Sequence, residues 1–318
     1  MGRVSLPSGF IGLTQLPQIG RGPARDLVMI HGLGASSGFW YASAVRWFRR
    51  FGRVTLFDLP GHGESDMPQT GYTPGQLARV LGELLDHLQI SHAHLVAHSY
   101  GGTVALSFAS GQPGRVASLV LADARLWAFE PPSLGHASGP RLQRLRDAGL
   151  ALTDSRLDVS IQVLVELARL RIEKDDAEPA VREALPGASS LFRGRRAAGK
   201  WLKLIETTQA YEEIIDPGGL SVTEIERIRQ PILAVYGGSS ARKQSALALQ
   251  QHCSRCELHV VPNVGHFFPL TRPRLFARPA LSFLRSIAGD KLRARRRLST
   301  PSIQFDTPEL PPAAETVL

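Results

Sequence analysis

The segment Leu95-Val-Ala-His-Ser-Tyr-Gly-Gly102 is the most informative part of the sequence. It joins an apolar run, typical of a buried strand, to a helical pattern rich in small residues. A serine at such a strand–turn–helix junction stands on a sharp elbow, where small residues two positions before and after it relieve backbone crowding. Ala97 and Gly101 occupy those two positions, so Ser99 is a candidate nucleophile.

Short apolar runs alternate with helical patterns on both sides of this segment. Each run is rich in Val, Ile and Leu and ends in turn residues, as buried strands do. The runs are residues 27–30, 54–57, 94–97, 116–121, 232–235 and 258–261. Helical patterns such as residues 77–88 and 102–110 lie between them. The alternation predicts an α/β fold with a mostly parallel, doubly wound central sheet, whose working residues gather at the carboxyl ends of the strands.

The alternation stops between residues 129 and 230, where apolar residues recur at helical spacing. A helical stretch of this length between two strands of one sheet is expected to form an inserted cap. We therefore expect the following division: an N-terminal lead-in at 1–25, a core at 26–128 and 231–288, a helical cap at 129–230, and a disordered basic, proline-containing tail at 289–318.

Composition and charge argue against several classes of protein. No apolar run approaches the ~20 residues of a membrane helix, and residues 1–20 lack the apolar stretch of a secretory signal. We therefore expect a cytoplasmic protein without an integral membrane segment. The net charge is +9, and basic residues concentrate at 291–297. Binding of nucleic acid would make that run essential, but charge runs are usually solvated, so we expect no nucleic-acid partner.

A glycine-rich turn, His31-Gly-Leu-Gly-Ala-Ser36, follows the first of the predicted strands. Such a turn lets a backbone N–H point at a reacting carbonyl, and the N–H groups of Leu33 and Tyr100 form the predicted oxyanion hole. The turn fits neither the dinucleotide-binding nor the Walker pattern, so no cofactor is expected. The pair Cys253 and Cys256 lacks the further ligands of a metal site, so no metal is expected either.

The segment Val264-Gly-His-Phe-Phe268 follows the last predicted strand. Its His266 comes after the nucleophile in chain order and lies in a loop at the carboxyl end of a strand. A general base must lie there to reach Ser99, so His266 is the candidate base.

Four motifs together resemble those of the α/β-hydrolase superfamily over residues 26–288. They are His31-Gly-x-Gly, Asp58-Leu-Pro-Gly-His-Gly-Glu-Ser65, His98-Ser-Tyr-Gly-Gly102 and Gly265-His-Phe267. The resemblance implies a serine nucleophile at Ser99, a base at His266, the oxyanion hole described above and a helical cap.

The acid that orients the histidine is missing from its usual place in this family. The loop Tyr236-Gly-Gly-Ser-Ser-Ala-Arg242 contains no carboxylate, and Ser240 stands where an aspartate is expected. A variation in the superfamily takes the acid from the end of the strand after the nucleophile helix, which here gives Asp123. Glu130 is the alternative acid.

We expect a serine hydrolase that cleaves an ester, thioester or related acyl bond of a small-molecule substrate through Ser99, His266 and Asp123. A carbon–carbon bond hydrolase is one alternative. Another is a non-catalytic ligand-binding or receptor-like protein on the same scaffold, which would typically lose a catalytic residue. The bond type, the substrate and the oligomeric state stay open.

Overall fold

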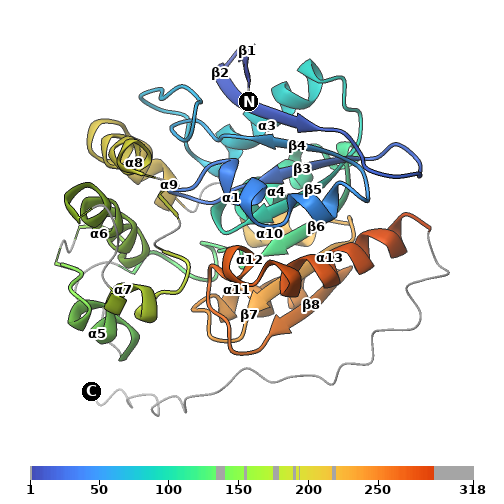
Figure 1. Ribbon diagram of the computed structural model, residues 1–318. Helices are drawn as coiled ribbons and strands as arrows, with labels where there is room; N and C mark the ends of the chain where they lie inside the picture. The colour runs from blue at the N-terminus through green and yellow to red at the C-terminus, as the bar shows by residue number, and fades with distance from the viewer. Residues whose placement is uncertain are drawn as a thin grey trace, which may run out of the picture.

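One eight-stranded sheet organises the molecule, with the strand order β1-β2-β4-β3-β5-β6-β7-β8 (Figure 1). The computed structural model describes residues 2–133, 140–153, 156–174, 179–188, 191–192, 194–216 and 220–289. The strands are β1 (Gly2–Leu6), β2 (Gly9–Leu16), β3 (Asp26–Ile30), β4 (Arg53–Phe57), β5 (Ala93–His98), β6 (Val116–Ala122), β7 (Ile232–Gly237) and β8 (Cys256–Val261). Strands β3 to β8 pair in parallel, which confirms the predicted fold class.

The hairpin of β1 and β2 was not predicted from the sequence. Both strands lie in residues assigned to a lead-in, and β2 pairs antiparallel with β4 at the edge of the sheet. Gly12, which looks like a strand breaker, has a packing reason. A Cβ atom on Gly12 would lie 2.6 Å from an Asp58 carboxylate oxygen, so a glycine within the strand lets that side chain approach closely.

Side chains alternate along each strand, so the mostly apolar strands present apolar residues on both faces of the sheet. Helices cover both of these faces. In β3, Leu27 and Met29 join one apolar cluster, while Val28 and Ile30 join another on the opposite face. The first face is covered by α1 (Gly38–Ala42), α2 (Val45–Phe48), α12 (Phe268–Thr271) and α13 (Pro273–Ile287). The second is covered by α3 (Pro74–His87), α4 (Tyr100–Gly111), α10 (Val222–Glu226) and α11 (Lys243–His252), and a short turn of 3₁₀ helix (Pro113–Arg115) precedes β6.

Of the six helices that the structure describes between β6 and β7, five lie together beside the sheet, in green to yellow in Figure 1. They are α5 (Pro140–Asp147), α6 (Val159–Lys174), α7 (Pro179–Ala184), α8 (Arg195–Thr207) and α9 (Ala210–Ile215). Helix α6 packs against α8. The Lys200 ammonium of α8 donates hydrogen bonds to the carbonyls of Gly63 at 2.7 Å and Ser65 at 2.6 Å, which ties this insertion to the core.

Among the residues that the structure describes, no helix has the length and apolar character needed to cross a membrane. The predicted tail lies outside the described residues beyond position 289.

Candidate active site

Ser99 lies between the end of β5 and the first residue of α4, with φ 53° and ψ −124°. This backbone conformation is rare for a residue with a side chain and costs about 1–3 kcal/mol, so the surroundings must enforce it. They do so by close packing. A Cβ atom on Gly101 would lie 2.4 Å from the His31 carbonyl oxygen, and one on Gly32 would lie 2.9 Å from the Ser99 Cβ. Ala97, which replaces the usual glycine of the motif, is accommodated without exposure.

His266 connects Ser99 to Asp123. Its Nε2 lies 3.1 Å from the Ser99 Oγ, and its Nδ1 lies 2.8 Å from Oδ2 of Asp123. The two bonds fix the tautomer, because a carboxylate can only accept: Nδ1–H donates to Asp123, which leaves Nε2 to accept from the serine hydroxyl. The structure therefore brings together Ser99, His266 and Asp123, the three side chains proposed from the sequence to act as a catalytic relay.

Asp123 is completely buried and follows β6 directly. The backbone N–H of Gly237 donates to Oδ1 at 2.9 Å, and the Ser240 hydroxyl donates to Oδ2 at 2.5 Å. Burial acts to raise the pKa of this carboxyl. The hydrogen bond and charge of His266, with the donors of Ser240 and Gly237, outweigh burial and hold the pKa below its ordinary value. Asp123 is therefore an anion in the folded protein at neutral pH.

Glu130, the alternative acid, has other partners. Its carboxylate accepts from Nη1 of Arg242 at 2.9 Å and from the backbone N–H of Ser245 at 2.9 Å. Asp123, and not Glu130, is hydrogen-bonded to His266.

His98 has a supporting position that the sequence did not reveal. Its Nε2–H donates to the backbone carbonyl of His266 at 3.0 Å, which holds the loop that carries the candidate base. Burial, together with the nearby His266, lowers the pKa of His98 to about 3, so its imidazole is neutral. The only sequence signal was its place in the motif next to Ser99.

The turn that carries Leu33 is held by two further neutral imidazoles. Nε2 of His62 accepts from the Gly34 N–H at 3.2 Å, and Nε2 of His31 accepts from the Leu59 N–H at 3.0 Å. Burial lowers the pKa of both, that of His62 to about 3, so both nitrogens can accept. The segment from Asp58 to Ser65 thus helps to shape the glycine-rich turn.

The two predicted oxyanion donors, Leu33 and Tyr100, line the same cavity as Ser99. Tyr100 is the first residue of α4, and the N–H groups of a first helical turn have no carbonyl partner within their own helix.

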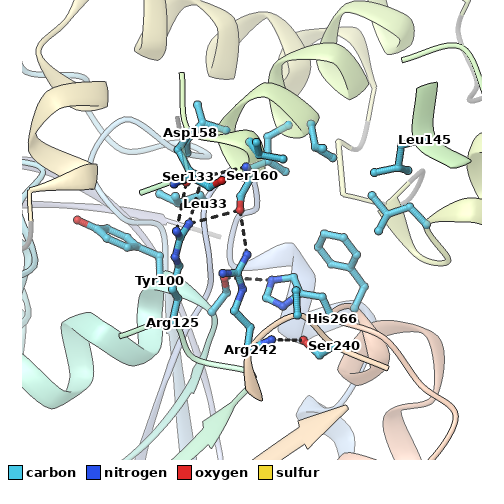
Figure 2. A pocket seen from close by; sticks show the side chains of 18 of the residues that line it. Leu33, Tyr100, Arg125, Ser133, Leu145, Asp158, Ser160, Ser240, Arg242 and His266 are labelled. Atoms are coloured by element: carbon cyan, nitrogen blue, oxygen red, sulfur yellow. Dashed lines mark hydrogen bonds and ion pairs between the residues drawn. The ribbon is translucent and has the colours of Figure 1, made fainter. Parts of the chain in front are cut away.

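A cavity of about 350 Å³ opens onto Ser99 and His266 and is lined by residues of both the core and the inserted helices. This volume is at the lower end of the range for small-molecule sites. One part is apolar, with Leu142, Leu145, Ile161, Val163, Leu164, Leu185 and Phe267. The other part is polar, with Arg125, Ser133, Asp158, Ser160 and Arg242 (Figure 2). None of these polar residues was singled out as a cavity residue from the sequence.

The described residues contain no group of three His, Cys, Asp or Glu side chains that could hold a metal ion. Burial raises the pKa of the Cys253 thiol to about 11 and that of Cys256 to about 12, which disfavours the thiolate that a metal site or a reactive cysteine requires.

Comparison with known proteins gives consistent similarities. A family model described as "Alpha/beta hydrolase family" matches residues 27–278. The pimeloyl-[acyl-carrier protein] methyl ester esterase of Nitrosomonas europaea is 29% identical over 265 residues, which cover 81% of this chain and 94% of that protein. The meta-cleavage product hydrolase of Pseudomonas fluorescens has a similar structure, with a TM-score of 0.61 at 22% identity, covering 90% of this chain and 98% of that one.

A further relative is longer than this chain. The dihydrolipoyllysine-residue acetyltransferase component of the acetoin cleaving system of Pseudomonas putida is 29% identical over 275 residues, and the match spans 84% of this chain but 65% of that protein.

Proposed function

Because this chain belongs to the alpha/beta hydrolase family, we propose that it is a serine hydrolase that cleaves an ester, thioester or related acyl bond of a small molecule. One observation carries the proposal: a single imidazole is hydrogen-bonded to the Ser99 hydroxyl on one side and to the buried Asp123 carboxylate on the other. This is the arrangement that activates a serine for attack on a carbonyl.

In the proposed reaction, Nε2 of His266 takes the proton of Ser99 as the serine oxygen attacks the substrate carbonyl. Asp123 stabilises the imidazolium that forms and keeps the ring in the productive tautomer. The imidazolium then returns the proton to the leaving group, which departs and leaves an acyl-enzyme. Water, activated by the same imidazole, releases the acid and regenerates Ser99.

The backbone N–H groups of Leu33 and Tyr100 are the proposed donors to the tetrahedral oxyanion. Loss of one such donor typically lowers the rate by about 10²–10³-fold. The neutral imidazoles of His31 and His62 support this role indirectly, because they hold the turn that carries Leu33.

The inserted helices are the proposed cap. Side chains from α5 and α6, and Leu185 just after α7, line the cavity with Ser99, so they are placed to determine which acyl group is accepted. The Nitrosomonas europaea relative is a methyl ester esterase, which favours an ester over the other acyl bonds.

The proposal is tested with a fluorophosphonate probe, p-nitrophenyl esters and acyl thioesters, on wild type and on Ser99→Ala. We expect wild type to become labelled on Ser99 and to turn over the esters, and Ser99→Ala to do neither. Ser133→Ala is the matched control, because Ser133 lines the same cavity and its hydrogen bonds to described residues use its backbone N–H and carbonyl. Absence of both labelling and turnover in wild type would contradict the proposal and favour a non-catalytic binding protein. Labelling without ester or thioester turnover would favour carbon–carbon bond cleavage.

A further inference from the structure

The polar part of the cavity is built around two ion pairs. Nη1 and Nη2 of Arg125 lie 3.1 and 3.2 Å from the two carboxylate oxygens of Asp158. Arg242 pairs with Glu130 at 2.9 Å. Ser160 stands between the two guanidinium groups, and its oxygen accepts from Arg242 at 2.9 Å and from Arg125 at 3.4 Å (Figure 2). We call Arg125, Asp158, Ser160 and Arg242 the donor wall.

The acceptors of the donor wall are already occupied. Besides Arg125, the Asp158 carboxylate accepts from the backbone N–H groups of Ser160 and Ser133, each at 2.9 Å. It thus has four donors, which use its full accepting capacity. Glu130 accepts on both of its oxygens. A ligand in the cavity therefore meets few free acceptors along this wall.

Donors of the same wall remain available. The Ser160 oxygen receives two N–H bonds, so its own proton must be donated elsewhere, and within the described parts of the chain it has no acceptor. Arg242 has five N–H groups, of which contacts to described residues engage two, one on Nη1 and one on Nη2. Arg125 differs, because all five of its N–H groups have a partner. Ser160 and Arg242 are thus the donors that face a ligand.

Charge decides what kind of acceptor fits. The two arginines are each matched by one carboxylate, and the side chains of Arg125 and Asp158 are 9% and 1% exposed. A carboxylate added to this wall would be desolvated without a net positive charge to compensate it, which is costly. A neutral oxygen, such as that of a ketone, needs only the hydrogen bonds.

The rest of the cavity fits hydrocarbon. Leu142 and Leu145 of α5 and Leu164 of α6 line it, and Phe267 follows the candidate base. Figure 2 shows Leu145 on the side away from Arg125, Asp158 and Ser160, so one ligand can contact both surfaces.

We infer that the preferred substrate is an acyl ester whose hydrocarbon chain carries a neutral carbonyl oxygen remote from the scissile bond, which accepts hydrogen bonds from Ser160 and Arg242. This inference rests on the proposed function, since the acyl group is placed in the cavity by reaction at Ser99, and it deepens that function by naming the substrate class.

The experiment compares p-nitrophenyl octanoate with its 5-, 6- and 7-keto derivatives, whose ketone is remote from the scissile bond, and with the mono-p-nitrophenyl ester of octanedioic acid. We expect kcat/KM for the best keto isomer to exceed that for octanoate by about tenfold, the effect of one well-placed hydrogen bond. The kcat/KM for the carboxylate-bearing ester should be lower than that for octanoate. Equal kcat/KM for octanoate and every keto isomer would overturn the inference, and so would a preference for the carboxylate.

Two variants identify the donors. Ser160→Ala removes one hydroxyl, and the double variant Glu130→Gln with Arg242→Met removes the ion pair without leaving a buried unpaired charge. Each should lower the keto preference, measured as the ratio of kcat/KM for the keto ester to kcat/KM for octanoate, severalfold, because one donor remains in each case. Ser133→Ala is the control and should keep the full preference. A loss of preference in Ser133→Ala equal to that in Ser160→Ala would contradict the assignment.

Failure of the proposed function is recognised separately. Octanoate turnover and Ser99 labelling report on the hydrolase activity alone, whatever the chain preference. Binding of the same esters to Ser99→Ala, measured by titration calorimetry, reports on the donor wall alone. Tighter binding of a keto isomer than of octanoate would support the inference even if wild type were inactive, and equal binding of all esters would reject it.

Discussion

Asp123 and Asp158 are both almost completely buried carboxylates near the same cavity, yet their partners differ. Asp158 is bound to the permanent charge of Arg125, so its negative charge is already neutralised. Asp123 is held by a hydroxyl, a backbone N–H and an imidazole. Its charge is therefore available to a group that becomes cationic during a reaction. The difference separates a carboxylate suited to catalysis from one suited to structure.

The strongest test of this comparison is the replacement Asp123→Asn. By the precedent of serine proteases, loss of the anion leaves the imidazole in the wrong tautomer, and we expect kcat to fall by about 10⁴-fold. The measurement is steady-state hydrolysis of p-nitrophenyl octanoate, with circular dichroism to verify folding. Glu130→Gln is the control and should keep kcat within about tenfold, because Glu130 contacts Arg242 and not His266. A larger loss in Glu130→Gln than in Asp123→Asn would reverse the assignment of the acid.

The replacement Asp158→Asn should act on stability instead. It leaves the buried Arg125 guanidinium without a counter-charge, and breaking a buried pair in this way typically costs about 3–5 kcal/mol of the free energy of unfolding. Equilibrium denaturation in urea measures this loss of the free energy of unfolding. Loss of stability below about 1 kcal/mol would show that Arg125 is solvated and that the two aspartates differ less than the contacts indicate.

The same pair predicts a pH dependence of stability. Burial acts to raise the pKa of Asp158, but the hydrogen bonds and charge of Arg125, with two backbone N–H donors, outweigh burial and hold this pKa below its ordinary value of 3.8. The unfolded chain therefore takes up a proton first as the pH falls, so the stabilisation is complete above pH 3.8 and is lost as the pH drops through the lower folded pKa. Urea denaturation across this range should show a flatter pH dependence for Asp158→Asn than for wild type.

The smallest of these effects is expected for Ser240→Ala, which removes one donor from Asp123. We expect kcat to fall by about tenfold. The acid limb of the pH profile of kcat/KM should move to higher pH, because a less stabilised carboxylate holds the neighbouring imidazolium proton more tightly. Ser240→Thr keeps the hydroxyl, so its kcat and the position of its acid limb should match those of wild type. A merely structural role would lower kcat without moving the acid limb.

The sequence predicted the parallel strands well because each contains a short run made mostly of apolar residues. In β5 every residue is buried, as periodicity alone suggests for a strand covered on both faces. It did not predict β1 and β2, because their pattern mixes glycines with exposed residues. The reason for Gly12 in β2 lies in its contact with Asp58, far away in the sequence.

The site was predictable only where a local motif exists. Ser99 and His266 each stand in such a motif, and the choice of Asp123 came from the absence of an acid in the loop of Ser240. The assignment of roles remains a prediction until the variants are measured. The pair of Arg125 and Asp158 joins residues 33 positions apart, and no local pattern indicates which charged residues of two distant segments will meet.

Each of two short segments carries a member of the donor wall close to the proposed relay. One segment also contains Asp123, and the other contains Ser240, which donates a hydrogen bond to Asp123. After β6, Asp123 is followed two positions later by Arg125, and after β7, Ser240 is followed two positions later by Arg242. Under the proposed function and substrate class, rate and selectivity are linked in these segments, so substitutions there should combine non-additively. Laboratory evolution of new substrate preferences should therefore proceed most readily at the apolar cavity residues of α5 and α6, where changes of side-chain volume leave the relay undisturbed.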